Sequence, residues 1–226
     1  MLKIPKFSAV IFDLDGLVLD TESGYRLAWQ EAAAHLGYSL SQEFLHGLTG
    51  LTGTAITHEL FNLLGADFPS QLFFELSAEI WRHHAESQGI SVKSGVYDCL
   101  AKLIHLNIPY ALATNSRKTN ALECLRYANL DDSFPTLICR DDVSSGKPSP
   151  DIYYATAHAL SVDITQCLVL EDSYPGVLAA VTAGAYCVYV PSTPKVDVNA
   201  LQQCHLLLMN LDQALDLIFT PSNLAQ

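Results

Sequence analysis

The chain has 226 residues, of which 50% are hydrophobic and 16% are charged, a composition typical of a globular protein rather than a disordered one. Its formal net charge of −12 and the lack of any lysine- or arginine-rich block argue against nucleic-acid binding, because such a chain repels a phosphate backbone. No apolar run approaches the roughly 18 residues of a membrane-spanning helix. The apolar stretch after Lys3 and Lys6 is too short for a signal peptide, so we expect a cytoplasmic protein that does not bind membranes.

Short apolar segments recur along the chain at intervals that suit the strands of a parallel sheet. They are apolar on both faces, as in sheets that helices cover on both sides. The alternation of strands with helical segments predicts an α/β fold with a doubly wound, Rossmann-like parallel sheet. We expect strands at 9–13, 109–115, 136–142, 167–172, 186–190 and 205–210, and helices at 95–106, 117–128, 150–160, 174–183 and 211–219.

One interval breaks this alternation, because far more residues lie between the first two predicted strands than a single crossover helix needs. Three segments in this interval, 22–37, 54–65 and 70–89, have helical patterns that each end at a glycine. We therefore predict a small all-helical cap domain, residues 19–90, inserted after the first strand. Residues 1–18 and 91–226 then form the α/β core.

Ligands of open parallel sheets bind at the carboxyl ends of the strands, and the sequence places chemically active residues at several of these ends. The first strand ends in Asp13, with Asp15 just beyond it. The remaining candidates are Thr114, Asn115 and Ser116 after the second strand, Lys147 in the loop before the helix at 150–160, and Glu171 and Asp172 after the fourth strand. The sequence therefore predicts an acidic site with one lysine at one edge of the sheet.

Neighbouring carboxylates raise each other's pKa and repel each other, so such a site needs a cation. Mg²⁺ prefers oxygen ligands and combines one or two carboxylates with a substrate phosphate. Lys147 and the Thr114 hydroxyl would hold the remaining phosphate oxygens. Because Asp15 lies just beyond Asp13, it suits a proton carrier. We therefore expect Asp13 to attack phosphorus and Asp15 to move protons.

The segments FDLDG, LATNS, GKPSPDIY and LVLEDSYPG resemble, in this order, the four motifs of the haloacid dehalogenase-like hydrolases. More narrowly, the chain resembles the β-phosphoglucomutase-like phosphatases, which carry a helical cap after the first strand. One such motif alone is weak, whereas four in order at strand ends are specific. The resemblance spans essentially the whole chain and implies a Mg²⁺-dependent phosphomonoesterase, a monomer that acts on a small phosphorylated substrate.

The resemblance also implies a role for each matching residue. Asp13 would be the nucleophile that forms an aspartyl-phosphate, and also a metal ligand. Asp15 would be the general acid/base and would offer its backbone carbonyl to the metal. Thr114, with the backbone of Asn115, would bind phosphate. Lys147 would neutralise the charge of the nucleophile and of the phosphoryl group.

Asp172 would complete the metal site with the help of Glu171, acting either as a direct ligand or as a support for its neighbours. Simpler explanations compete with these assignments. The two aspartates could cap a turn, Thr114 could cap the following helix, and Lys147 could be a solvated loop residue. The presence of all four motifs favours the functional interpretation.

Within such a family the cap selects the substrate. Residues 19–90 contain no lysine and only two arginines, Arg26 and Arg82, whereas a mutase grips a second phosphate with basic side chains. The family's mutases carry a histidine where this chain has Tyr25. We therefore expect hydrolysis of a sugar phosphate or similar metabolite, rather than a phosphosugar mutase or a non-catalytic binding protein. Tyr25, Arg26 and Trp29 are candidate specificity residues, with packing inside the cap as the alternative.

Overall fold

The computed structural model describes residues 4–49, 51, 53–193 and 195–218. It divides the chain into two compact units. The first, Met1–Asp20 with Ser91–Gln226, is called the core below, and the second, Thr21–Ile90, is called the cap. In the part of the chain that is described, no helix has the length and apolar character needed to cross a membrane.

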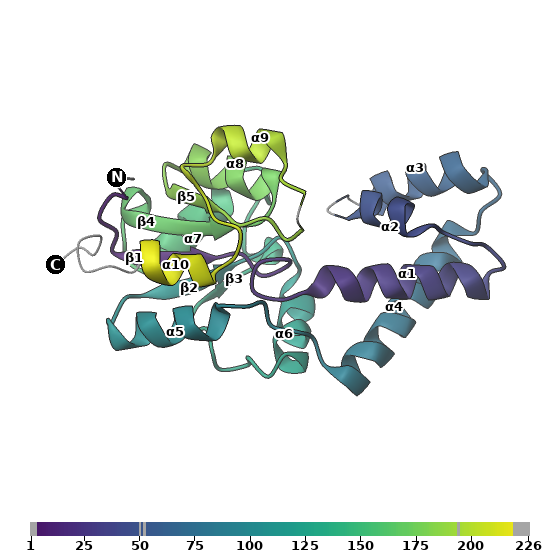
Figure 1. Cartoon of the computed structure of the whole chain (residues 1–226), viewed down its shortest axis with the longest axis horizontal. Coiled ribbons are helices and arrows are strands. Elements are labelled where there is room, and N and C mark those ends of the chain that lie inside the picture. The colour runs from purple at the N-terminus through teal and green to yellow at the C-terminus, as the bar shows by residue number, and fades with distance from the viewer. Residues whose placement is uncertain (1–3, 50, 52, 194, 219–226) are drawn as a thin grey trace. The chain divides into compact units, whose positions relative to one another are not determined.

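Parallel strands form the sheet of the core, in the order β3-β2-β1-β4-β5-β6 (Figure 1). The order runs outward in both directions from β1, as in doubly wound sheets, so the predicted fold class is confirmed. The strands are β1 (Ala9–Phe12), β2 (Tyr110–Ala113), β3 (Leu137–Ile138), β4 (Cys167–Glu171), β5 (Tyr186–Tyr189) and β6 (Leu206–Leu207).

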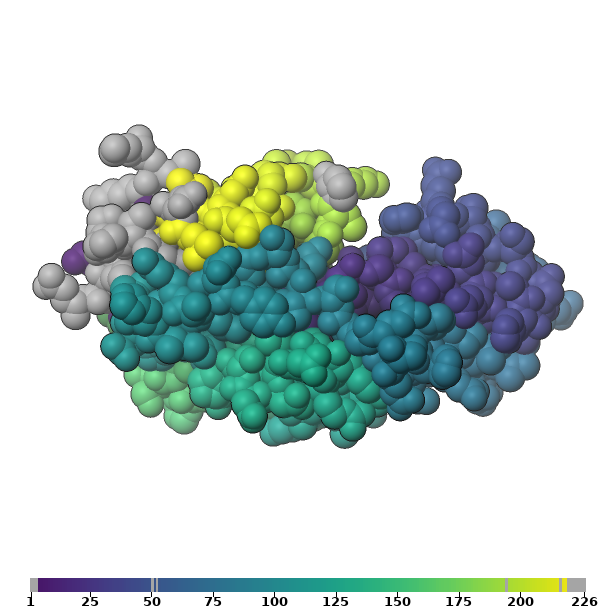
Figure 2. All heavy atoms as spheres, turned by 60° about the horizontal axis from the view of Figure 1, so that its bottom comes forward, coloured from purple at the N-terminus to yellow at the C-terminus, as the bar shows by residue number. Residues whose placement is uncertain are grey.

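Helices cover both faces of this sheet. Side chains of α7 and α8 pack with Ala9, Ile11 and Val169 from one face, while α5 and α10 lie on the other side (Figure 1). Figure 2 shows α5, α6 and α10 at the surface of that second side. The helices of the core are α5 (Val96–His105), α6 (Lys118–Tyr127), α7 (Asp151–Ala159), α8 (Tyr174–Ala183), α9 (Val198–Gln203) and α10 (Asp212–Leu217), with short 3₁₀ turns η1 (Arg140–Asp142) and η2 (Ile164–Gln166).

The structure departs from the predicted elements of the core at the third predicted strand and at a helix before the last strand. The predicted strand at 136–142 is wrong beyond Ile138, because the Asp142 side chain accepts a hydrogen bond from the Cys139 backbone (2.9 Å) and closes the turn η1. Helix α9 was not predicted, although Asp197 caps it by accepting hydrogen bonds from two backbone N–H groups. Residue 219 of the last predicted helix lies outside the described residues.

The cap consists of helices α1 (Thr21–His35), α2 (Gln42–Leu48), α3 (Gly53–Leu64) and α4 (Ser70–Gln88). Its interior is apolar and includes Leu45, Leu60 and Phe73. A β-carbon on Gly24 of α1 would lie 3.2 Å from the Trp81 indole nitrogen of α4, so glycine favours this close approach. Helix α2 was not predicted, because seven residues are too few for a clear helical period.

Candidate active site

The register of the central strands brings the predicted site residues to one level of the sheet. Phe12 lies beside Leu112 of β2 and Leu170 of β4. One residue further, the Asp13 backbone donates a hydrogen bond to the Leu170 carbonyl (3.0 Å). Asp13, Thr114 and Glu171 therefore leave three neighbouring strands at the same edge, although long stretches of sequence separate them.

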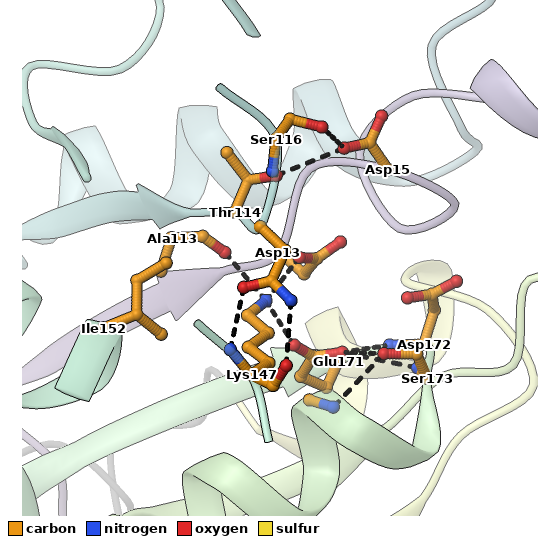
Figure 3. Close-up of polar contacts among 12 residues, drawn as sticks. Asp13, Asp15, Ala113, Thr114, Ser116, Lys147, Ile152, Glu171, Asp172 and Ser173 are labelled. Atoms are coloured by element: carbon orange, nitrogen blue, oxygen red, sulfur yellow. Dashed lines mark hydrogen bonds and ion pairs between the residues drawn. The ribbon is translucent and has the colours of Figure 1, made fainter. Parts of the chain in front are cut away.

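Lys147 joins two of these carboxylates. Its ammonium nitrogen lies 2.5 Å from Asp13 Oδ1 and 2.5 Å from Glu171 Oε1, and it also donates to the Ala113 carbonyl at 2.9 Å (Figure 3). The side chains of all three ionic groups are buried. The structure therefore places Lys147 in the acidic site rather than in solvent.

Glu171 is fully buried and accepts hydrogen bonds on both oxygens. Oε1 also accepts from the Tyr153 hydroxyl at 2.5 Å, and Oε2 accepts from the backbone of Asp172 (3.1 Å) and the Ser173 hydroxyl (3.1 Å). A β-carbon on Gly176 would lie 1.9 Å from Oε1, so only glycine fits at this position in the first turns of α8. These contacts fix the carboxylate that faces Lys147.

One ammonium thus serves two buried carboxylates. Burial raises the pKa of Asp13 well above its ordinary value, and the charges of Glu171 and Asp15 raise it further, while Lys147 opposes them. Burial alone would lower the pKa of Lys147, but Asp13 and Glu171 outweigh it, and the pKa lies above its ordinary value. The lysine is therefore a permanent cation, and the three acids of the cluster, Asp13, Glu171 and Asp172, outnumber it.

The donor set fits a divalent cation. Asp13, Glu171 and Asp172 each offer one carboxylate oxygen, and these three atoms lie within 4.8 Å of one another. A β-carbon on Gly16, whose φ is +88°, would lie 2.1 Å from Asp172 Oδ2, so the turn after β1 needs glycine to pass this close to the third acid. Mg²⁺ prefers oxygen ligands such as these carboxylates.

Asp15 lies apart from the lysine cluster, in a different hydrogen-bond environment (Figure 3). Its Oδ2 accepts a hydrogen bond from Ser116 Oγ at 2.7 Å and from Thr114 Oγ1 at 3.2 Å. Asp15 is partly exposed, whereas Asp13 and Thr114 are buried. The two aspartates, two positions apart in sequence, therefore occupy different environments.

Asn115 contacts Lys147 through its side chain. Its Nδ2 donates to the Lys147 carbonyl (3.0 Å), and its Oδ1 accepts from the Lys147 backbone nitrogen (2.8 Å). The Arg140 guanidinium donates to the carbonyls of Val143 (2.9 Å) and Ser144 (3.3 Å) in the same loop. The loop that carries the lysine is thus tied to the end of β2.

The sequence did not indicate Tyr153 as part of this site, and it indicated Asn115 and Ser116 without the contacts that they make. The pattern around Tyr153 predicts only a helix, the family resemblance implies only a backbone role for Asn115, and neither indicates a contact of Ser116 with Asp15. Tyr153 lies two residues after Asp151 at the start of α7, where a buried tyrosine looks like any core aromatic. A buried phenol needs a hydrogen-bond partner, and that requirement was the available signal.

The candidate specificity residues of the cap contact one another or their neighbours on the cap. The Tyr25 ring stacks on Trp81 (centroids 5.3 Å apart) and on Trp29 (6.2 Å). Arg26 donates a long hydrogen bond to Thr49 (3.4 Å) and lies 4.0 Å from Glu22. The aromatic group is partly buried at Tyr25 and Trp29 and buried at Trp81, which supports a packing role for Tyr25 and Trp29 inside the cap.

Comparison with known proteins shows the family to which this chain belongs. The sequence model of the haloacid dehalogenase-like hydrolases matches residues 10–190. The match spans most of the chain, so this protein belongs to the haloacid dehalogenase-like hydrolase family. The family predicted from the four motifs is confirmed.

Individual relatives refine the comparison. The chain is 29% identical over 209 residues to validoxylamine A 7′-phosphate phosphatase of Streptomyces hygroscopicus subsp. limoneus, covering 92% of this chain and 95% of the relative. It is 30% identical over 179 residues to fructose-1-phosphate phosphatase YqaB of Escherichia coli (strain K12), covering 79% and 94%. A crystal structure from Thermotoga maritima, assigned as a β-phosphoglucomutase, matches with a TM-score of 0.79 and 27% identity over 93% of this chain and 99% of that one.

Proposed function

We propose that this protein is a Mg²⁺-dependent phosphomonoesterase that hydrolyses a small phosphorylated metabolite, of the sugar phosphate class, through an aspartyl-phosphate on Asp13. The observation that carries the proposal is the contrast between the two aspartates. Asp13 is buried against Lys147 and close to two further acids, whereas Asp15 is bound by hydroxyl groups. This separation is what a nucleophile and a proton carrier need.

In the first step, an oxygen of Asp13 attacks the phosphorus of the substrate. The bond between phosphorus and the ester oxygen breaks, and Asp15 gives its proton to the departing oxygen. A covalent intermediate divides a difficult displacement into two easier ones. Thr114 and the Asn115 backbone would hold the phosphoryl oxygens in this step.

In the second step, a water molecule attacks the phosphorus of the aspartyl-phosphate. Asp15 takes the proton of that water, the bond between phosphorus and Asp13 breaks, and inorganic phosphate leaves. Lys147 offsets negative charge on Asp13 and on the phosphoryl group in both steps. Glu171 and Tyr153 keep the lysine in place.

Asp13, Asp172 and Glu171 would hold Mg²⁺ with their carboxylates, and Asp15 with its backbone carbonyl. When bound, the ion supplies positive charge that offsets the repulsion among the carboxylates and the phosphoryl oxygens. The excess of acids over the single lysine supports this assignment. Glu171 already accepts bonds from Lys147 and Tyr153, so its first role in the proposal is to position Lys147.

The composition of the cap supports hydrolysis over phosphoryl transfer between sugar hydroxyls. The cap has no lysine, and Arg26 lies beside Glu22, so the cap offers little positive charge for a second phosphate. Two relatives named as phosphatases act, by their names, on a fructose phosphate and on a validoxylamine phosphate. We extend the substrate class, not the individual substrate, to this chain.

A phosphosugar mutase is the second candidate, favoured by the structural similarity to a protein assigned as a β-phosphoglucomutase. It makes a distinct prediction, the formation of glucose 6-phosphate from β-glucose 1-phosphate in the presence of a bisphosphate. We also propose that the protein works in the cytoplasm as a monomer, without nucleic acid or membrane partners. The net charge of −12 supports the absence of a nucleic-acid partner.

The proposal is tested by phosphate release from a panel of phosphorylated metabolites that includes fructose 1-phosphate, with Mg²⁺ and with EDTA. We expect release from at least one sugar phosphate with Mg²⁺, loss of this activity in EDTA and recovery when Mg²⁺ is restored. Absence of release across the panel would overturn the phosphatase assignment. Turnover at the full rate in EDTA would overturn the role of the metal.

A further inference from the structure

The hydroxyl groups at the end of β2 make a contact that the mechanism above does not use. Ser116 Oγ donates to Asp15 Oδ2 at 2.7 Å, and Thr114 Oγ1 donates to the same oxygen at 3.2 Å (Figure 3). Ser116 is itself fixed on both sides, because its backbone nitrogen donates to Thr114 Oγ1 (3.0 Å) and its carbonyl accepts from the Arg140 backbone (3.1 Å). The serine is thus a fixed donor to the proposed proton carrier.

Capping of the next helix does not explain the serine. Helix α6 begins at Lys118, and the side chain of its N-cap residue Arg117 does not cap it; the Lys118 backbone N–H donates instead to Asp141 Oδ2 at 3.0 Å. The Ser116 hydroxyl points instead to Asp15, a residue about a hundred positions away in the sequence. The contact therefore serves the site rather than the helix.

Thr114 and Ser116 differ in what they can offer once phosphate binds. A hydroxyl group has a single proton to donate, and Thr114 donates its proton to Asp15 in this structure. The proposed function needs the same proton for a phosphate oxygen. When Thr114 donates to the phosphate, its contact with Asp15 is lost. The shorter contact, from Ser116 to Asp15, can persist.

We propose that Ser116 is a positioning residue that holds Asp15 for proton transfer, while Thr114 shares this task only until phosphate takes its donor. This inference rests on the proposed function. The hydrogen bond keeps the Asp15 carboxyl on the β2 side of the site, away from Lys147, whose two carboxylate partners already hold it. Ser116 gives up no proton: as the phosphorus–oxygen bond breaks, the proton passes from Asp15 to the ester oxygen.

The first test compares two substrates of similar shape whose leaving groups differ in their need for a proton. Phenyl phosphate releases a basic phenolate, whereas p-nitrophenyl phosphate releases an anion that needs little protonation. General acid–base catalysis contributes roughly 100-fold or more, and Ser116→Ala should forfeit a part of it. We expect kcat/KM to fall about tenfold on phenyl phosphate and less than about threefold on p-nitrophenyl phosphate.

Ser116→Thr keeps the hydroxyl and should recover most of the loss on phenyl phosphate. Thr119→Ala removes an exposed hydroxyl from α6, the helix that follows Ser116, and should leave the hydrolysis of both substrates unchanged. A structural role for Ser116 would lower kcat/KM equally on both substrates. That equal loss would overturn the inference, as would a failure of the threonine variant to restore activity.

A double-mutant cycle that combines Ser116→Ala with Asp15→Asn tests whether the serine acts through Asp15. If Ser116 acts through Asp15, Ser116→Ala should cause no further loss on p-nitrophenyl phosphate or phenyl phosphate in the Asp15→Asn background. If the losses in kcat/KM from the two substitutions were additive, the role of Ser116 would be contradicted, while the phosphatase assignment would stand. If the wild-type protein hydrolyses neither substrate nor any member of the metabolite panel, the proposed function itself fails, so the two failures are distinguishable.

Discussion

Different kinds of contact stabilise the core and the cap, each within its own unit. The core buries ionic groups: Asp13, Lys147 and Glu171 form an ion-paired cluster at the ends of β1 and β4. Each of these groups depends on the others, because an unpaired buried charge is costly. The chemistry of the core is therefore coupled to its stability.

The cap is held mainly by apolar and aromatic side chains such as Phe68 and Phe73. Its ion pairs, such as Arg26 with Glu22 (4.0 Å), are partly exposed, and exposed pairs of this kind contribute little. Aromatic packing tolerates changes of shape better than a buried ionic cluster tolerates a change of charge. Under the proposed function, this contrast would let the core keep its chemistry while changes in the cap alter the substrate.

Removal of the lysine should have the largest effect on the core. Lys147→Ala leaves two buried carboxylates without their cation, so we expect kcat to fall by about 100-fold or more and the free energy of unfolding to fall by about 3–5 kcal/mol. Urea unfolding and phosphate release measure the two effects.

Lys118→Ala is the matched control, because the Lys118 ammonium is exposed and lies 4.0 Å from Asp142. It should change the free energy of unfolding by less than about 1 kcal/mol. If both substitutions lowered the free energy of unfolding equally, the buried ion pairs of Lys147 would stabilise the core no more than an exposed ion pair does.

Tyr153→Phe should have a smaller effect. It removes only the hydroxyl that donates to Glu171, and a hydrogen bond to a charged group contributes about 1.5–3 kcal/mol. The neighbouring Tyr154, which is 47% exposed, provides the control Tyr154→Phe, which should be nearly neutral. Urea unfolding measures this difference. Indistinguishable unfolding curves for the two variants would show that the Tyr153 hydroxyl does not stabilise the contacts around Glu171.

Tyr25→Ala tests the cap. If Tyr25 selects the substrate, kcat/KM for the preferred sugar phosphate should fall about tenfold, equivalent to about 1.4 kcal/mol, while p-nitrophenyl phosphate is hydrolysed almost normally. Equal losses on both substrates would assign Tyr25 to packing against Trp81.

Alkaline pH should weaken the core specifically. Burial raises the pKa of Cys99 to about 12, so the unfolded chain loses this thiol proton first. The stability contributed by the protonated thiol is complete below about pH 9 and falls as the pH rises above it. The expected loss is about 1.4 kcal/mol by pH 10 for this one thiol.

Cys99→Ala should make the urea midpoint less sensitive to pH between 8 and 10. All six cysteines lie in the core, and both tryptophans, Trp29 and Trp81, lie in the cap. Tryptophan fluorescence therefore follows the cap, while far-UV circular dichroism follows both units. A pH dependence that Cys99→Ala leaves unchanged would show that the thiol does not contribute.

Much of the core could be predicted from the sequence because β1, β2 and β4 are continuous apolar runs, each followed by polar residues. In a parallel sheet the topology alone brings such strand ends together, so Asp13, Thr114 and Glu171 were placed at one edge without knowledge of any contact. Short elements were less predictable. Strand β3 has only two residues. Helices α2 and α9 are too short to show a helical period, and their capping residues, Ser41 and Asp197, were the only sequence features that could have indicated them.

The hydrogen-bond network around the site could not be predicted from residue order. Which donors reach Glu171 depends on how far α7 and α8 lie from β4, and no sequence pattern encodes that distance. Tyr153 and Gly176 consequently looked like ordinary helical residues. The same limit applies to the cap, where helical periodicity indicates an apolar face but identifies no substrate.

Hydrolysis by Asp13→Asn tests the central claim most directly. Asparagine keeps the shape of the side chain and removes its nucleophilic charge, and loss of a nucleophile costs on the order of 10⁴-fold or more in kcat. We predict that the variant keeps the circular dichroism spectrum of the wild type and releases phosphate from p-nitrophenyl phosphate at least about 10⁴-fold more slowly at saturating Mg²⁺. A folded variant that hydrolyses this substrate at a rate close to that of the wild type would contradict the account.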